Sequence, residues 1–308
     1  MADTGTARGG RRRGRHVAGQ RDGEAGPGLV APSATSGLFE VFRRRYLLRL
    51  LVRREISARY QGSFLGLFWS YLQPAFRLAI YYFVIAEILD RGTENFAIHL
   101  FAGMVMVHFF TESFGAGTRS IVRNKSLVQK MAIPREMFPV ASMLVSAYHV
   151  VPGMVMLGGF CVALGWRPDL IGLAAGLLAF ALVAVLGTAL ALLFSAANVF
   201  FRDFSNVVQT LTQFTTFSVP MIYPYSLVEQ RFGDFAQYYL LNPMAEAVLL
   251  FQRAFWTGTT DDPVATEAEH LPDHLFALGF AHLGVALVVL ALGQLVFNRL
   301  ENKIPERL

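Results

Sequence analysis

Six long apolar segments constrain what this chain can fold into. They run over residues 64–89, 96–117, 137–164, 170–199, 207–223 and 275–297. A helix needs about 20 predominantly apolar residues to cross the hydrocarbon core of a bilayer, and each segment is near or above that length except the fifth, which is short. Because backbone polar groups find no water in lipid, such segments form helices. The pattern predicts an all-α, polytopic membrane protein with six transmembrane helices.

The composition agrees with this fold class and argues against two others. Of the 308 residues, 54% are hydrophobic and 16% are charged, whereas a typical soluble domain carries about 25% charged residues. This argues against an ordinary soluble enzyme, and the apolar content excludes a disordered chain. The one cysteine, Cys161, provides neither an internal disulfide nor a zinc site.

A seventh apolar segment, 238–256, is predicted not to cross the membrane. It contains Asn242, Pro243, Glu246, Gln252 and Arg253. Polar groups at mid-bilayer cost several kcal/mol each, so we interpret this segment as re-entrant or interfacial. The prolines and tyrosines of 217–225 favour a broken helix at a pore exit just before it.

The positions of the basic residues predict the orientation. Most of the 27 lysines and arginines lie before the first span, in the loop 118–136 and after the last span. The loops assigned to the other side carry one or two each, and the segment 224–273 is rich in acids. Cytoplasmic loops carry an excess of Lys and Arg, so both termini, including 301–308, are predicted to be cytoplasmic. A seventh span would place the basic C-terminus outside.

Two N-terminal segments precede the spans. Residues 1–35 are rich in Gly, Ala, Pro and Arg, and we expect a disordered, basic cytosolic tail near anionic lipid. They contain no apolar run of signal-peptide length. Residues 36–60 combine arginines with Phe39, Phe42 and Tyr46 at helical spacing. A helix of this kind lies in the membrane interface, and the alternative is a helix that packs on a soluble partner.

The search for catalytic and cofactor motifs is negative. No lysine follows a glycine, so the chain has no phosphate-binding loop for ATP. It also lacks H-E-x-x-H, C-x-x-C and G-x-S-x-G. His108 and Glu112 share one helix face and could form a proton relay or a metal pair, but we expect an interhelical hydrogen bond. We predict no catalytic, cofactor-binding or metal-binding residue in this chain.

The first span carries an arginine among aromatic rings. Arg77 lies close behind Pro74, and a charged side chain there is expected to face protein or water rather than lipid. We predict a pathway for a polar ligand; the alternative is an aromatic belt with ordinary packing. The predicted pathway residues are Trp69, Tyr71, Arg77, Tyr81, Tyr82, Phe214, Phe217 and Tyr223.

The loop 121–134 reads as a short amphipathic cytosolic helix that ends before Pro134. A solvated loop has no need of its apolar residues, whereas a helix that docks in the groove of a cytosolic partner does. The alternative is a helix that lies on lipid. The predicted docking residues are Asn124, Lys125, Leu127, Val128, Lys130, Met131, Pro134 and Arg135.

Five motifs occur together in a characteristic order. They are RYQGSFLGLFWSYLQP, NKSLVQKMAIPREMFP, the Arg202-Asp203 turn, PMIYP and LNPM. Over residues 38–258 the chain resembles the ABC-2 type permeases and is most similar to exporters of O-antigen, capsular polysaccharide and teichoic acid.

The resemblance implies a half-transporter whose transmembrane domain, 61–300, forms a homodimer in a bacterial cytoplasmic membrane. Two copies of a separate ATPase would bind ATP and Mg, so this chain needs no cofactor. The segment 121–134 would be the coupling helix, 38–58 the interface helix and 224–258 external re-entrant helices. A lipid-linked glycan or polyol phosphate would pass through an aromatic-lined channel.

Three rival functions remain at this point. Exporters of drugs or lipids share the fold that the resemblance implies. A membrane-embedded transferase would need an acidic catalytic cluster at the membrane face, which the sequence does not offer. A proton-coupled carrier usually shows an internal repeat, and we find no convincing one.

Overall fold

The computed structural model describes residues 37–64, 66–88, 93–131, 133–301 and 303–308. Within these ranges the secondary structure is helical, without a strand, as the apolar pattern predicts. The predicted N-terminal tail, 1–35, lies outside the described residues.

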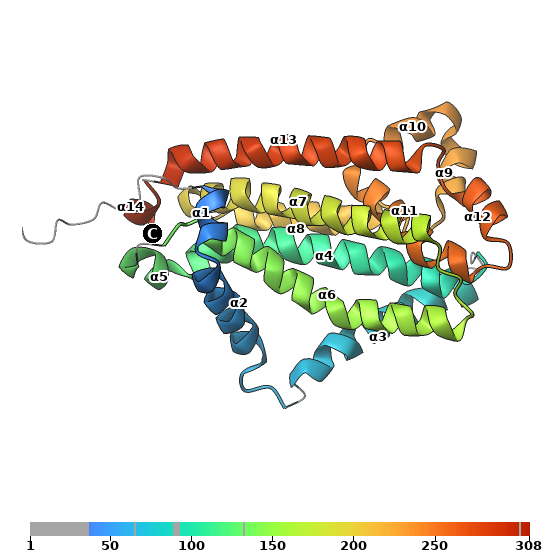
Figure 1. Cartoon of the computed structure of the whole chain (residues 1–308), viewed down its shortest axis with the longest axis horizontal. Helices are drawn as coiled ribbons and strands as arrows, with labels where there is room; N and C mark the ends of the chain where they lie inside the picture. Colours follow the sequence, from blue (N-terminus) through green and yellow to red (C-terminus); the bar gives the residue numbers. More distant parts are fainter. Residues whose placement is uncertain (1–36, 65, 89–92, 132, 302) are drawn as a thin grey trace, which may run out of the picture. The chain divides into compact units, whose positions relative to one another are not determined.

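Four long helices form the body of the structure (Figure 1). They are α4 (Phe96–Arg123), α6 (Met137–Ala163), α7 (Leu170–Phe200) and α13 (Leu275–Glu301), and all four are long and apolar enough to cross a membrane. Helix α7 packs against α4 and α13, and α4 also packs against α6. Gly117 of α4 approaches Ala191 of α7 so closely that a side chain at Gly117 would have no room. These helices agree with the second, third, fourth and sixth predicted spans.

The first and fifth predicted spans differ from the expected continuous helices. The first contains α3 (Trp69–Tyr82), which has Pro74 inside it and continues as a π-helical segment, Phe83–Ile88. The fifth contains α8 (Phe204–Phe217), whose 14 residues extend about 21 Å, less than the ~30 Å of a hydrocarbon core. Pro220 disfavours helical backbone at the residue before it, which helps to end α8 early. The structure thus supports four spans by length, and six spans remain a prediction.

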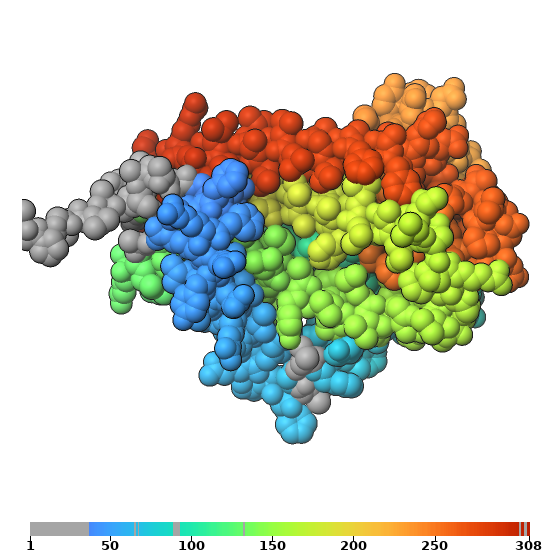
Figure 2. Space-filling view, viewed as in Figure 1, coloured from blue at the N-terminus to red at the C-terminus, as the bar shows by residue number. Residues whose placement is uncertain are grey.

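The predicted N-terminal helix is divided in two. Helix α1 (Leu38–Arg43) and helix α2 (Arg45–Tyr60) meet at Arg44. Leu48 and Leu51 of α2 are buried, and α2 packs against α6. Figure 2 shows α1 and α2, in blue, covering one end of the long helices. In Figure 1 the short helices α5 (Lys125–Lys130) and α14 (Ile304–Arg307) lie at that same end.

The other end carries four short helices between α8 and α13. They are α9 (Tyr225–Phe232), α10 (Ala236–Tyr239), α11 (Pro243–Phe255) and α12 (Pro263–His270). The Asn242 side chain accepts a hydrogen bond from the Met244 N–H and so caps α11. Helix α11 is buried against α4, α7 and α13, but its 13 residues extend only about 20 Å.

The burial of α11 explains how its polar residues are accommodated. Gln252 is fully buried, and its side-chain amide donates to the backbone oxygens of Pro220, at 2.8 Å, and His99, at 3.3 Å. Glu246 is also fully buried and has no hydrogen-bond partner among the described residues. Both side chains are enclosed by protein, as polar groups at membrane depth require.

Candidate functional site

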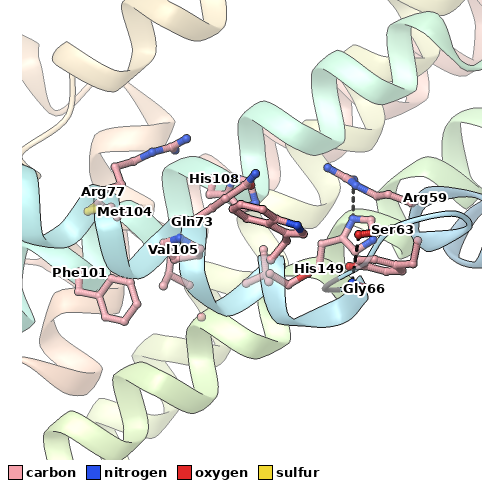
Figure 3. A pocket seen from close by; sticks show the side chains of 16 residues that line it. Arg59, Ser63, Gly66, Gln73, Arg77, Phe101, Met104, Val105, His108 and His149 are labelled. Atoms are coloured by element: carbon pink, nitrogen blue, oxygen red, sulfur yellow. Dashed lines mark hydrogen bonds between the residues drawn. The ribbon is translucent and has the colours of Figure 1, made fainter.

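A cavity of about 260 Å³ lies between α2 and α3 on one side and α4 and α6 on the other. Its lining includes Arg59 and Tyr60 from α2, Trp69 and Arg77 from α3, and apolar side chains of α4 and α6. In Figure 3, Arg59 and Arg77 lie at opposite ends of this lining, with His108 between them. We call it the first cavity.

Arg59 is the centre of a polar cluster at one end of the first cavity. Its Nη1 forms an ion pair with Glu112 of α4 and lies 2.6 Å from Nδ1 of His149 on α6. A guanidinium only donates hydrogen bonds, so Nδ1 of His149 accepts and the ring hydrogen lies on Nε2. That Nε2 is buried and has no partner among the described residues. The cluster therefore contains one buried N–H that has no partner among the described residues, beside the Arg59 guanidinium.

The cluster around Arg59 includes Glu112, one member of the predicted pair of His108 and Glu112. Glu112 forms the expected interhelical hydrogen bond, and its partner is Arg59 of α2. Within the described ranges, no three His, Cys, Asp or Glu side chains gather as they would around a metal ion. We find no support there for a metal pair at this position.

A second cavity, of about 340 Å³, lies between α3, α4 and α8. It is lined by Arg77 and Tyr81 from α3, by His108 and Thr111 from α4, and by Phe217 at the end of α8. Arg77, Met104 and His108 line both cavities. In the part of the chain that the structure describes, Arg77 has no ion pair or hydrogen bond. A cation without a protein partner thus lies where the two cavities meet.

The two cavities bring together only part of the predicted pathway. Trp69 lines the first cavity, Tyr81 and Phe217 line the second, and Arg77 lines both. Tyr71, Tyr82, Phe214 and Tyr223 line neither.

The four remaining pathway residues have different surroundings. Phe214 is 70% exposed on α8, and Tyr82 is exposed on α3. Tyr71 is half-buried. The Tyr223 hydroxyl donates to the backbone oxygen of Phe217 at 3.0 Å and lies 3.2 Å from the Tyr239 hydroxyl. Tyr223 therefore has a bracing contact at the end of α8.

The predicted docking segment is shorter than expected and partly buried. Residues up to Arg123 continue α4, and the separate helix α5 spans only Lys125–Lys130. Val128 and Pro134 are buried, and Leu127 is half-buried, so these side chains pack on the bundle. Lys125, Lys130 and Met131 are exposed.

Asn124 joins this segment to α2. Its Oδ1 accepts from Arg54 at 3.1 Å, and its Nδ2 donates to Glu55 at 3.1 Å. Arg123 also forms an ion pair with Glu55. Asn124 is buried, so it connects α4 and α5 to α2 rather than facing a partner.

Arg135 and Glu136 connect the same segment to α13. Arg135 donates to the backbone oxygen of Glu301 and lies 3.9 Å from its carboxylate. Gln294 donates to the buried Glu136 carboxylate at 2.9 Å. The docking segment is therefore held by both α2 and α13.

An ion cluster at the opposite end was not predicted. Arg253 of α11 bonds both carboxylate oxygens of Asp169 at 3.0 Å, and its Nε lies 2.7 Å from Glu267 of α12. The hydrogen bond from Arg253 lowers the pKa of Asp169. The cluster joins three segments far apart in the sequence, and only the composition of 238–256 hinted at Arg253.

Comparison with known proteins gives one family and several relatives. The ABC-2 type transporter family model matches residues 46–256. The O-antigen export system permease protein RfbA of Myxococcus xanthus is 29% identical over 230 residues, which cover 72% of this chain and 85% of that protein. A protein of the same description from Klebsiella pneumoniae is 24% identical over 261 residues, covering 84% of this chain and 94% of the relative.

Proposed function

The chain belongs to the ABC-2 type transporter family, and we propose that it is the permease subunit of an exporter that moves a lipid-linked polysaccharide across a bacterial cytoplasmic membrane. The family match confirms the resemblance inferred from the motifs. The relatives named as O-antigen export permeases support a polysaccharide as the cargo.

The observation that carries this proposal is the meeting of the two cavities at Arg77. Arg77 is exposed on this chain, in a segment that is predicted to cross the membrane, and an unpaired arginine in the hydrocarbon region costs about 2.5 kcal/mol or more. The position of Arg77 is explained if a polar substrate or water fills the two cavities. Trp69 and Tyr81 offer rings beside Arg77, and ring faces give sugars weak, repeated contacts of the kind that processive movement needs.

The same proposal includes a homodimer. Helices α3 and α8 expose several large apolar side chains, among them Phe76, Ile80, Phe214 and Phe217. Exposed apolar surface of this extent marks a contact with lipid or protein. In a dimer, two copies of these faces would enclose the channel, with Tyr71, Tyr82, Phe214 and Tyr223 added to its wall.

The motor is proposed to be a separate ATPase that binds ATP and Mg. The sequence has no phosphate-binding loop, and α5 offers a short cationic surface with the exposed Met131 beside it. An apolar side chain among lysines suits a helix that docks in a groove. The end of the molecule with α1, α5 and α14 would then face the cytoplasm.

Deletion of the gene tests the proposed cargo. Loss of surface polysaccharide together with accumulation of its lipid-linked form inside the cell is expected. A strain that keeps its surface polysaccharide but loses export of a lipid or a drug would contradict the cargo while leaving the permease class intact.

A further inference from the structure

The lining of the first cavity contains cationic side chains and, among the described residues, no carboxylate. Arg59 and His149 line one end of it, and Arg77 lines the opposite end. Arg59 and Arg77 only donate hydrogen bonds, and His149 has its free hydrogen on Nε2 because Nδ1 accepts from Arg59. The two arginines without a lining carboxylate favour a negatively charged ligand with acceptor oxygens, although Gln73 and the hydroxyls of Ser63 and Ser70 in the same lining can both donate and accept.

His149 gives this argument a second basis. Its exposed fraction is 7%, and Nε2 has no partner among the described residues. A buried donor without an acceptor destabilises the fold, so such donors are rare unless a ligand or water satisfies them. The His149 ring lines the cavity beside Arg59, but its Nε2 is covered, so an oxyanion bound to Arg59 would reach Nε2 only after the covering side chains shift.

Among the described residues, the acid that pairs with Arg59 is Glu112, which does not line the cavity. The Glu112 carboxylate supplies Arg59 with a negative charge. An incoming oxyanion would compete with Glu112 for the same guanidinium, because both bind through its N–H groups.

We propose that the first cavity binds the phosphate or diphosphate group of the lipid-linked substrate, and that Glu112 pairs with Arg59 only until that group arrives. This inference rests on the proposed function. Phe101, Val105 and Val150 line the same cavity and would contact the first carbons of the lipid. A volume of about 260 Å³ holds a headgroup and its nearest atoms, not a polymer.

Replacement of Glu112 by an oxyanion at Arg59 would also affect the contacts next to the docking segment. Glu112 lies on α4, whose last residue, Arg123, is ion-paired to Glu55 on α2. Arg59 and Glu55 are one turn apart on α2. Release of Glu112 would therefore loosen one of two ionic links between these helices while the other remains.

Binding to the purified full-length chain in a maltoside detergent, which carries no phosphate, tests the site. The probes are farnesyl diphosphate, farnesol and a short-chain phosphatidylglycerol. Farnesyl diphosphate is expected to bind and farnesol is not. Arg59→Gln should weaken binding about tenfold or more, the effect of losing a charge-assisted hydrogen bond. Glu112→Gln should tighten it several-fold, because the competing carboxylate is gone.

The opposite signs of these two variants separate a binding site from a structural brace. If the pair only holds α2 against α4, both variants weaken binding alike, and the proposal is overturned. Arg49→Gln removes an exposed charge from the same helix and should leave binding unchanged. Should Arg59→Gln fail to fold, Glu112→Gln alone decides by its sign.

The lipid probes and an export assay decide the remaining outcomes. Equal binding of phosphatidylglycerol and farnesyl diphosphate would overturn the assignment to substrate and indicate a site for anionic membrane lipid. A wild-type chain that exports polysaccharide but binds neither lipid would refute the site and leave the proposed function standing. A wild-type complex that exports no polysaccharide would refute the proposed function, whatever it binds.

Discussion

At the scale of single residues, Arg77 is the side chain whose position most needs a physical reason. It lies on α3 between two cavities, and no described residue forms an ion pair with it. If it braced the helix, its charge would need a fixed partner. A charge that meets a passing substrate needs only water in the resting state.

We therefore expect Arg77→Ala to reduce export without reducing the yield of the purified complex. Surface polysaccharide should fall at least tenfold, whereas the yield of purified complex and its basal ATP hydrolysis should stay near the wild-type values. Arg77→Lys should restore part of the export, because a cation remains. A parallel fall of export and of complex yield would return Arg77 to a packing role.

Some residues of the candidate site could be predicted from the sequence, and others could not. The sequence pointed to Arg77 because it is a charged residue in an apolar segment. It pointed to Trp69 and Tyr81 because they are aromatic residues of the same segment. Arg59, Glu112 and His149 meet from three helices, and Arg59 lies 53 positions from Glu112 and 90 from His149. No local pattern indicates that they touch, so this cluster became visible only in the folded chain.

At the scale of elements, length and composition identified the four long helices, because about 20 apolar residues have few alternatives to a spanning helix. The first and fifth segments do not form single long α-helices. Pro74 removes a backbone donor inside α3 without ending it, and the helix changes to π-helical backbone only at Phe83. Pro220 disfavours helical backbone just after α8. Hydropathy averages over such single residues and so misses where a helix breaks.

Docking of the ATPase makes an element-scale prediction for the segment after α5. Met131→Asp should reduce co-purification of the ATPase at least tenfold, because it places an unpaired charge in an apolar groove. Met131 is 47% exposed, so insertion and yield should not change. Val264→Asp, an equally drastic change at an exposed position of α12, is the matched control. Normal ATPase recovery with Met131→Asp would remove this side chain from the interface.

The ion cluster that joins α7, α11 and α12 predicts a pH dependence. The hydrogen bond from Arg253 lowers the pKa of Asp169 below its ordinary value of 3.8, so its contribution to stability is complete above that value and is lost as the pH falls through the lowered one. Because Asp169 is 46% exposed, we expect about 1 kcal/mol or less.

Thermal unfolding in detergent measures this contribution. Asp169→Asn should lower the midpoint by a few degrees at pH 7, and the difference from wild type should shrink below about pH 4. Asp234→Asn, at an exposed position in the same half of the molecule, should change nothing. A difference that persists at low pH would mean that the carboxylate charge is not its cause.

At the scale of the whole molecule, the number of membrane crossings depends on the two short segments. Four helices satisfy the length requirement, and the basic residues require that the loop at 118–136 and the C-terminus share one side. This requirement is met only if α8 crosses, because α6, α7 and α13 alone make three crossings between that loop and the C-terminus. By the same count, α3 with its π-helical extension must cross if the basic residues before it share the side of the loop. Two crossings in a thinned or protein-lined region would need less than the full ~30 Å, because water and neighbouring helices satisfy the freed backbone groups.

Reporter fusions distinguish these arrangements. The six-span arrangement predicts alternating outside and inside signals, starting outside, at Thr93, Lys130, Asp169, Ser205, Asp262 and Lys303. If neither short segment crosses, α4, α6, α7 and α13 still reverse direction in turn, so Thr93 and Lys130 keep opposite signals, but Ser205 and Asp262 fall on the same side. The pair at Ser205 and Asp262 therefore tests α8 directly, since only a crossing between them gives opposite signals. A cytosolic signal at Asp262 would contradict the six-span arrangement and would also place the ion cluster of Arg253, Asp169 and Glu267 on the side of the ATPase.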